Sequence, residues 1–126
     1  MKVSSVSGLV LFAKDLDKTA KFYNSLGFRF GKRTPDRLTL YVNWFSLDFT
    51  TVGKDDKAEI QKENALTNKG AGVYIMISVL NVNEFYQEVV AEGFKPMGQP
   101  QDKPTGKREF VLRDPDGYKL VFFQKL

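Results

Sequence analysis

One carboxylate stands out because it lies within a run of large apolar residues. Residues 44–52 alternate, with Phe45, Leu47 and Phe49 on one side and mostly polar side chains on the other, among them Asp48. A period of two predicts a strand whose two faces meet different environments. A buried carboxylate is costly unless it has a partner. Asp48 is therefore either an exposed or paired side chain, or a pocket anchor for a cationic or hydrogen-bonding ligand.

The sequence contains neither histidine nor cysteine. This composition excludes disulfides, thiolate metal sites and cysteine nucleophiles. It also removes the commonest general base and the commonest ligand of transition metals. Catalytic arrangements of the Ser-His-Asp or Cys-His kind are therefore excluded.

The elements that position these residues occur twice along the chain. Residues 9–28 and 75–94, at a constant offset of 66, share an apolar run, an Asp or Asn, a helical stretch and then Gly-Phe. Such internal similarity predicts two structural modules with equivalent positions.

Each module is predicted to be a strand, a helix and three further strands. Asp15 or Asp17 is expected to cap the first helix, Asn81 the second, and Gly27 and Gly93 to end them. The polar segment 53–70 is expected to connect the modules with one helical turn, and Asp114-Pro115-Asp116-Gly117 is expected to form a turn. The predicted strands are 8–13, 28–33, 37–43 and 44–52, then 73–79, 94–98, 108–113 and 118–124; the helices reach Leu26 and span 82–92, and 99–107 is a loop.

Two segments carry a family resemblance: DLDKTAKFYNSLGF at 15–28 and REFVLRDPDGYKLVFF at 108–123. Together with the paired modules, they resemble the vicinal oxygen chelate superfamily, which includes glyoxalase I, extradiol dioxygenases, fosfomycin-resistance enzymes and bleomycin-resistance proteins. The resemblance implies an α+β fold in which two βαβββ modules form a curled mixed sheet, or cup. It implies one domain over 1–126, with module one at 1–52, the connection at 53–70 and module two at 71–126.

In the metal-using members of that superfamily, the first and last strands of each module supply one ligand each. The corresponding positions here are Gly8, Asp48, Tyr74 and Val121. Glycine and valine have no ligating side chain, and a phenol is protonated at neutral pH. A divalent site commonly needs three or four protein ligands. We therefore expect a member without the metal site, with no cofactor and no catalytic residue of the family.

Strand alternation then predicts which side chains line the cup. Each has a simpler alternative: Phe12 and Trp44 as core, Tyr74 in a structural hydrogen bond, and Met76 as a gap-filler. Arg113 could neutralise Asp48, bind an anionic ligand or form a surface ion pair. The predicted ligand-binding residues are Phe12, Trp44, Ser46, Asp48, Tyr74, Met76, Arg113, Val121 and Phe123.

An aromatic-rich cup without metal ligands favours a small-molecule binding protein resembling bleomycin-resistance proteins, which sequester an aromatic or amphipathic compound. Those proteins are acidic, whereas this chain has a net charge of +4, so an anionic or neutral ligand fits as well as a cationic one. The alternatives are a lyase or dioxygenase-type enzyme that uses Asp48, Tyr74 or non-standard metal ligands, and a structural or regulatory dimer.

The remaining expectations concern partners and location. Residues 69–76 resemble an RNA-binding signature, but its stacking positions hold Ala71, Val73 and Met76, so no nucleic-acid partner is expected. The chain has no membrane-length apolar run and no apolar stretch near its start, so we expect no membrane contact and a soluble, cytoplasmic protein. The resemblance implies a homodimer.

Overall fold

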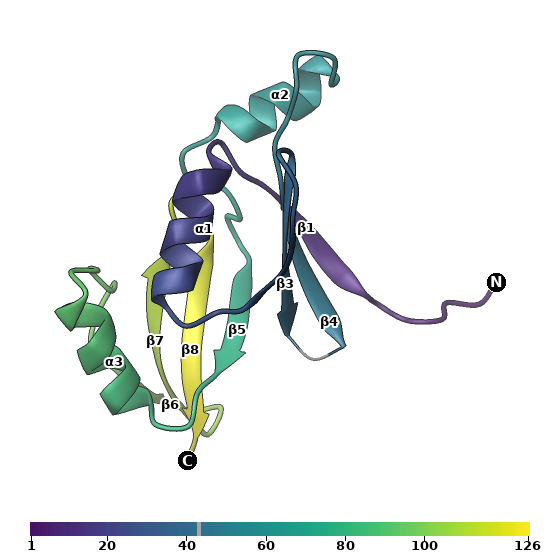
Figure 1. Cartoon of the computed structure of the whole chain (residues 1–126). Helices are drawn as coiled ribbons and strands as arrows, with labels where there is room; N and C mark the ends of the chain where they lie inside the picture. The colour runs from purple at the N-terminus through teal and green to yellow at the C-terminus, as the bar shows by residue number, and fades with distance from the viewer. Residues whose placement is uncertain (43) are drawn as a thin grey trace. The chain divides into compact units, whose positions relative to one another are not determined.

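The computed structural model describes residues 1–42 and 44–126, which form two compact units, Met1–Leu66 and Thr67–Leu126. Each unit contains one four-stranded mixed sheet and one helix between its first two strands (Figure 1). The α+β class and the repeated strand–helix–strand–strand–strand order are confirmed.

In the first unit the strands lie in the order β1-β4-β3-β2. The strand β1 runs parallel to β4, and the other neighbours are antiparallel. A short helix, α2, follows the sheet within the predicted connection and has two turns rather than one. The elements are β1 Gly8–Phe12, α1 Leu16–Ser25, β2 Phe30–Arg33, β3 Arg37–Val42, β4 Phe45–Thr50 and α2 Ala58–Ala65.

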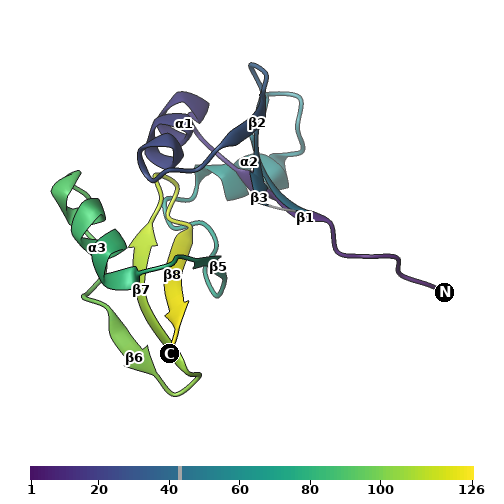
Figure 2. The ribbon, with the colours of Figure 1, turned by 60° about the horizontal axis from the view of Figure 1, so that its bottom comes forward.

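The second unit repeats this topology in the order β5-β8-β7-β6. Here β5 is parallel to β8, and α3 lies along β7 and β8, as Figure 2 shows from a second direction. The elements are β5 Tyr74–Ser78, α3 Val82–Ala91, β6 Gln101–Lys103, β7 Lys107–Arg113 and β8 Lys119–Lys125.

The predicted caps are confirmed at both ends of the two main helices. The side chain of Asp15 accepts hydrogen bonds from the backbone N–H groups of Asp17 and Lys18, and the side chain of Asn81 accepts one from Glu84. Each helix is followed by a glycine in the left-handed region, Gly27 at φ 89° and Gly93 at φ 93°. A glycine adopts this conformation without steric cost, and so the chain reverses there.

The core of each unit lies between the helix and one sheet face. Tyr23 of α1 is fully buried, with its ring 4.8 Å from that of Phe49. In the second unit, the ring of Phe85 on α3 lies 4.7 Å from that of Phe122 and 6.3 Å from that of Phe110. Each fully buried ring contributes about 1.5–3 kcal/mol. Because these residues occupy alternate strand positions, they orient Asp48 and Val121 toward the opposite faces.

The predicted strand at 94–98 is wrong. Proline stands at residues 96 and 100, and a proline has no N–H to donate to a strand ladder. The only strand between α3 and β7 is β6, Gln101–Lys103, which lies inside the predicted loop at 99–107. The strand β6 therefore lies between two prolines, Pro100 and Pro104.

The turn predicted at Asp114-Pro115-Asp116-Gly117 is confirmed. The side chain of Asp114 accepts hydrogen bonds from the backbone of Asp116 and Tyr118, and Gly117 has a φ of 91°. A Cβ on Gly117 would lie 2.6 Å from the carbonyl oxygen of Thr67. The turn is therefore packed closely against the segment at the start of the second unit.

Candidate functional site: two sheet faces of different chemistry

The first candidate surface is the face of the first sheet opposite α1, which we call the Asp48 face. Asp48 lies at its centre, paired across the sheet with Val10 on one side and Thr39 on the other. The face comprises Gly8, Val10, Phe12, Arg37, Thr39, Ser46, Asp48 and Thr50.

The carboxylate of Asp48 is half-buried and hydrogen-bonded. Thr39 Oγ1 donates to its Oδ1 at 2.5 Å, and this hydroxyl compensates part of the cost of burying the charge. The site is hydroxyl-rich, which suits a ligand that forms hydrogen bonds. A hollow of about 560 Å³ opens here, lined by Lys32, Thr34, Asp36, Arg37, Thr39, Ser46, Asp48 and Thr50.

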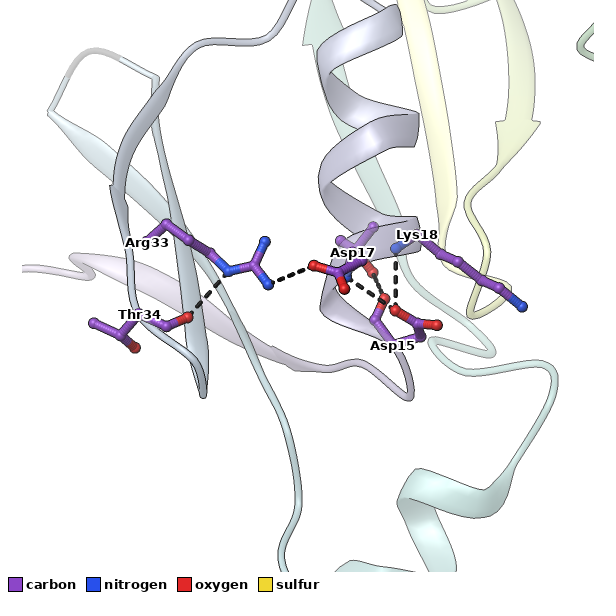
Figure 3. Close-up of polar contacts among 6 residues, drawn as sticks. Asp15, Asp17, Lys18, Arg33 and Thr34 are labelled. Atoms are coloured by element: carbon purple, nitrogen blue, oxygen red, sulfur yellow. Dashed lines mark hydrogen bonds and ion pairs between the residues drawn. The ribbon is translucent and has the colours of Figure 1, made fainter.

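The hairpin beside this hollow forms a surface ion pair with the first helix, shown in Figure 3. Arg33 Nη2 lies 2.9 Å from Asp17 Oδ1 in the first turn of α1, and Arg33 Nε donates to the carbonyl of Thr34 at 3.0 Å. The residues on either side of Arg33, which are Lys32 and Thr34, both line the hollow. The ion pair therefore links the β2–β3 hairpin to the first turn of α1.

The second candidate surface is the face of the second sheet opposite α3, which we call the Tyr74 face. Tyr74 and Met76 on the edge strand are 61% and 45% exposed, whereas Val121, between its partners Met76 and Val111, is fully buried. The face comprises Tyr74, Met76, Ser78, Gln101, Lys103, Lys107, Glu109, Val111, Arg113, Lys119, Val121, Phe123 and Lys125.

A second hollow, of about 430 Å³, lies on this unit and is large enough for a small aromatic compound. Its walls come from Tyr74 of β5, from the loop after α3, from β6 and the turn after it, and from β7. The lining residues are Tyr74, Met97, Gly98, Gln99, Gln101, Lys103, Pro104, Thr105, Glu109, Phe110 and Val111.

Two lysines on the Tyr74 face lie over aromatic rings. Lys107 Nζ is 4.8 Å from the ring centroid of Phe123, and Lys119 Nζ is 4.9 Å from that of Tyr74. A cation over a ring face is attracted by the ring quadrupole, by about 0.5–1 kcal/mol at an exposed site. Tyr74 and Phe123, two of the aromatic residues predicted from the sequence, are thus each associated with a cation that the sequence did not indicate.

Several predicted site residues lie where alternation places them, and Trp44 differs. Ser46 and Phe12 are half-buried on the Asp48 face, and Phe123 is half-buried on the Tyr74 face. Trp44 is 86% exposed in the turn before β4 and is not a core residue, because the strand begins at Phe45. Arg113 is exposed and donates to Asn68 Oδ1 and to the carbonyl of Gly117.

Sequence reasoning missed the partners that lie across the sheets. Thr39 and Lys107 belong to neighbouring strands, and only the strand register shows that they lie beside Asp48 and Phe123. The alternation of each neighbouring strand was visible in the sequence, but alternation alone does not say which residues of two strands lie opposite each other.

The ladders confirm that the four predicted chelating positions are equivalent in pairs. In the first sheet, Val10 pairs with Asp48 and Gly8 pairs with Ser46. At the equivalent positions of the second sheet, Met76 pairs with Val121 and Tyr74 pairs with Lys119. The same registers in both sheets agree with the offset of 66 between the modules' first strands.

The residues at these positions do not fit a metal. Within residues 1–42 and 44–126, no group of three or more carboxylate side chains is placed to bind an ion. A Cβ built on Gly8 would lie 2.5 Å from the backbone oxygen of Ser46 and 2.7 Å from its Oγ. The backbone therefore leaves no room for a ligating side chain at this position.

None of the helices in the described part of the chain is long and apolar enough to cross a membrane.

Residues 5–122 match the model of one protein family, the Glyoxalase/Bleomycin resistance protein/Dioxygenase superfamily. No curated protein sequence matches the chain. Among solved structures, a glyoxalase/bleomycin resistance protein/dioxygenase from Nocardioides has a TM-score of 0.74 at 20% identity, covering 100% of this chain and 86% of that one.

Two further structures concern bleomycin. A bleomycin resistance determinant encoded on the transposon Tn5 has a TM-score of 0.71 at 22% identity, covering 97% of this chain and 98% of its own. A bleomycin-binding protein complexed with bleomycin has a TM-score of 0.70 at 22% identity, covering 98% of this chain and 100% of its own. At these sequence identities, the similarity between this chain and the three structures shows a shared fold.

Proposed function

Because the chain belongs to the glyoxalase/bleomycin resistance protein/dioxygenase superfamily, we propose that it is a small-molecule binding protein that holds an aromatic or amphipathic compound without a metal. One observation carries the proposal. Where the superfamily's metal-using members place ligands, this chain has Gly8, Tyr74 and Val121 with Asp48 alone, and no room for a side chain at Gly8.

The Tyr74 face supplies the apolar surface that such a ligand needs. Tyr74 and Met76 are 61% and 45% exposed, and a ligand that covered them would gain about 25 cal/mol for each Å² of apolar surface buried. Phe123 and Val111 extend this surface, and the hollow beside them gives it depth. An aromatic ring would stack against Tyr74 with little loss of conformational freedom.

The relatives suggest what binding achieves. One of them is described as bleomycin-binding and another as a bleomycin resistance determinant, so sequestration of a toxic compound is the role we propose by analogy. A cytoplasmic location is part of this proposal.

We further propose that the chain acts as a homodimer. Strands β1 and β5 are edge strands, and both carry exposed apolar side chains, Val10 at 54% and Met76 at 45%. Exposed apolar edges favour pairing with another chain. Sedimentation equilibrium of the purified protein would give the mass, and a monomer at all concentrations would contradict this part.

A ligand screen by thermal shift tests the proposal. The panel contains anionic, neutral and cationic aromatic compounds, with bleomycin among the cationic ones. At a ligand concentration 100 times the Kd, stabilisation reaches about 2.7 kcal/mol, which is readily seen. If no compound in the panel raises the Tm, the binding proposal fails.

A matched pair of variants locates the site. Tyr74→Ala should weaken binding of the best compound by about tenfold, because it removes the exposed ring. Val90→Ala is the control, since Val90 is 44% exposed on α3 and lies off the Tyr74 face. Equal loss in both variants would place the ligand elsewhere.

The alternative of an enzyme that uses Asp48, Tyr74 or non-standard metal ligands has its own discriminator. Elemental analysis of protein purified without chelators should find no stoichiometric divalent metal. One metal per chain would favour the enzyme and overturn the argument from ligand chemistry.

A further inference from the structure

Three lysines lie directly opposite one another at one end of the Tyr74 face. Lys103 on β6 pairs with Lys107 on β7, and Lys107 pairs with Lys125 on β8. Side chains at directly opposed positions on antiparallel strands have Cβ atoms about 4.5–5.5 Å apart. Like charges in such pairs destabilise a sheet, so this row, which we call the lysine row, opposes the stability of its own fold.

The local backbone holds the row in place. The turn between β6 and β7 closes through a hydrogen bond from Gly106 N to the carbonyl of Lys103 at 3.0 Å, and Gly106 has a φ of 83° that suits glycine. The backbone N–H of Leu126 donates to the carbonyl of Gly106 at 2.9 Å and fixes the end of β8 beside the turn. The three ammonium groups are therefore carried by one hydrogen-bonded hairpin and its neighbour.

An aromatic ring lies in the row next to the lysine row. This adjacent row comprises Gln101, Glu109, Phe123 and Ser78, and Lys107 Nζ already lies 4.8 Å from the Phe123 ring centroid. Lys103 also lines the hollow of about 430 Å³. Within the described residues, the ion pairs of this unit are Lys69–Asp116 and Arg108–Asp102, and neither uses a lysine of the row.

We propose that the lysine row binds the anionic group of an amphipathic aromatic ligand, such as a carboxylate, sulfonate or phosphate, while the aromatic body lies against Phe123 and in the hollow. The anion would relieve the repulsion among the three ammonium groups, and this gain is available only to a negatively charged ligand. This inference rests on the proposed function and specifies the ligand class for the same face.

The test uses two fluorescent probes that differ in one group. 8-Anilinonaphthalene-1-sulfonate carries a sulfonate on the naphthalene ring system, and N-phenyl-1-naphthylamine is the same skeleton without it. The sulfonate probe should bind at least tenfold more tightly at low ionic strength, and the ratio should shrink as NaCl screens the charges. If the neutral probe binds as tightly, the inference fails and the proposed function survives; if neither binds, the proposed function fails with it.

Charge variants place the anion on the row. Lys107→Gln should weaken sulfonate-probe binding by about 1.5-fold to fivefold, the range for one ion pair near a surface, and leave the neutral probe unchanged. Its Tm should change little, because the relief of like-charge repulsion offsets the lost contact with the Phe123 ring, so lost binding cannot be attributed to unfolding.

Two further variants and one further ligand complete the test. Lys95→Gln removes the same charge from the exposed segment between α3 and β6, and it should leave both probes unaffected. Lys119→Gln removes the other ring-associated cation, and a larger loss there than at Lys107 would overturn the assignment. Single-stranded DNA should bind more weakly than the sulfonate probe at physiological salt; tighter binding would identify a nucleic-acid surface instead.

Discussion

A buried ion pair joins the start of the second unit to its last hairpin. Lys69 Nζ lies 2.7 Å from Asp116 Oδ1, and the two side chains are only 4% and 3% exposed. The backbone N–H of Lys69 also donates to the Asp116 carbonyl at 3.0 Å, while that of Asp116 donates to Asp114. The pair therefore fixes the segment before β5 against the β7–β8 turn.

Replacing Asp116 by asparagine removes the negative charge and keeps the shape. At 2.7 Å and an effective dielectric constant of about 20, the attraction is about 6 kcal/mol. Desolvation of both ions offsets much of this, but a buried ammonium that has lost this carboxylate keeps much of its penalty. We expect Asp116→Asn to lower the free energy of unfolding by about 3–5 kcal/mol.

Urea unfolding followed by circular dichroism measures the change, with Lys69→Met, Asp116→Leu and the double variant completing a cycle. Because the double variant removes both charges of the pair, its cost should be at least about 2 kcal/mol less than the sum of the single costs. A loss below about 1 kcal/mol in Asp116→Asn, or strict additivity in the cycle, would refute the reasoning.

Three other substitutions test the local architecture. Gly8→Ala should lower the free energy of unfolding by about 1–3 kcal/mol, because the added Cβ would meet the backbone of Ser46. Gly98→Ala is the control and should change the free energy little, because the space around Gly98 is open. Equal effects of the two substitutions would contradict the claim that Gly8 has no room for a side chain. Arg33→Gln should cost at most about 1 kcal/mol, and the loss should vanish in 1 M NaCl; a salt-independent loss would point to packing instead of charge. Asp15→Ala should cost about 1 kcal/mol in the same urea assay by removing the helix cap, and an unchanged midpoint would show that the cap is dispensable.

The fold was largely readable from the sequence because its signals are local. The caps at Asp15 and Asn81 and the glycines that follow the helices lie within a few residues of the elements they terminate. The prediction of a strand at 94–98 was wrong for an equally local reason. Apolar and aromatic letters suggested a strand, but the prolines at 96 and 100 removed ladder donors.

The site was harder to predict from the sequence, because it depends on strand register and on close contacts between neighbouring strands. Asp48 was recognisable as an outlier, but its donor Thr39 comes from a strand whose alignment only the structure shows. The closed position at Gly8 depends on a backbone oxygen of Ser46. The lysine row likewise requires three strands in register, and no single window of sequence contains all three residues.

Metal-free binding of a small aromatic ligand is the central claim, and one titration tests it most directly. The sulfonate probe is titrated into protein kept in excess EDTA, and again into protein supplied with Zn²⁺ or Mn²⁺. We predict the same Kd in both conditions, because Gly8, Tyr74 and Val121 offer no chelating set with Asp48. Binding that appears only with added metal would contradict the account.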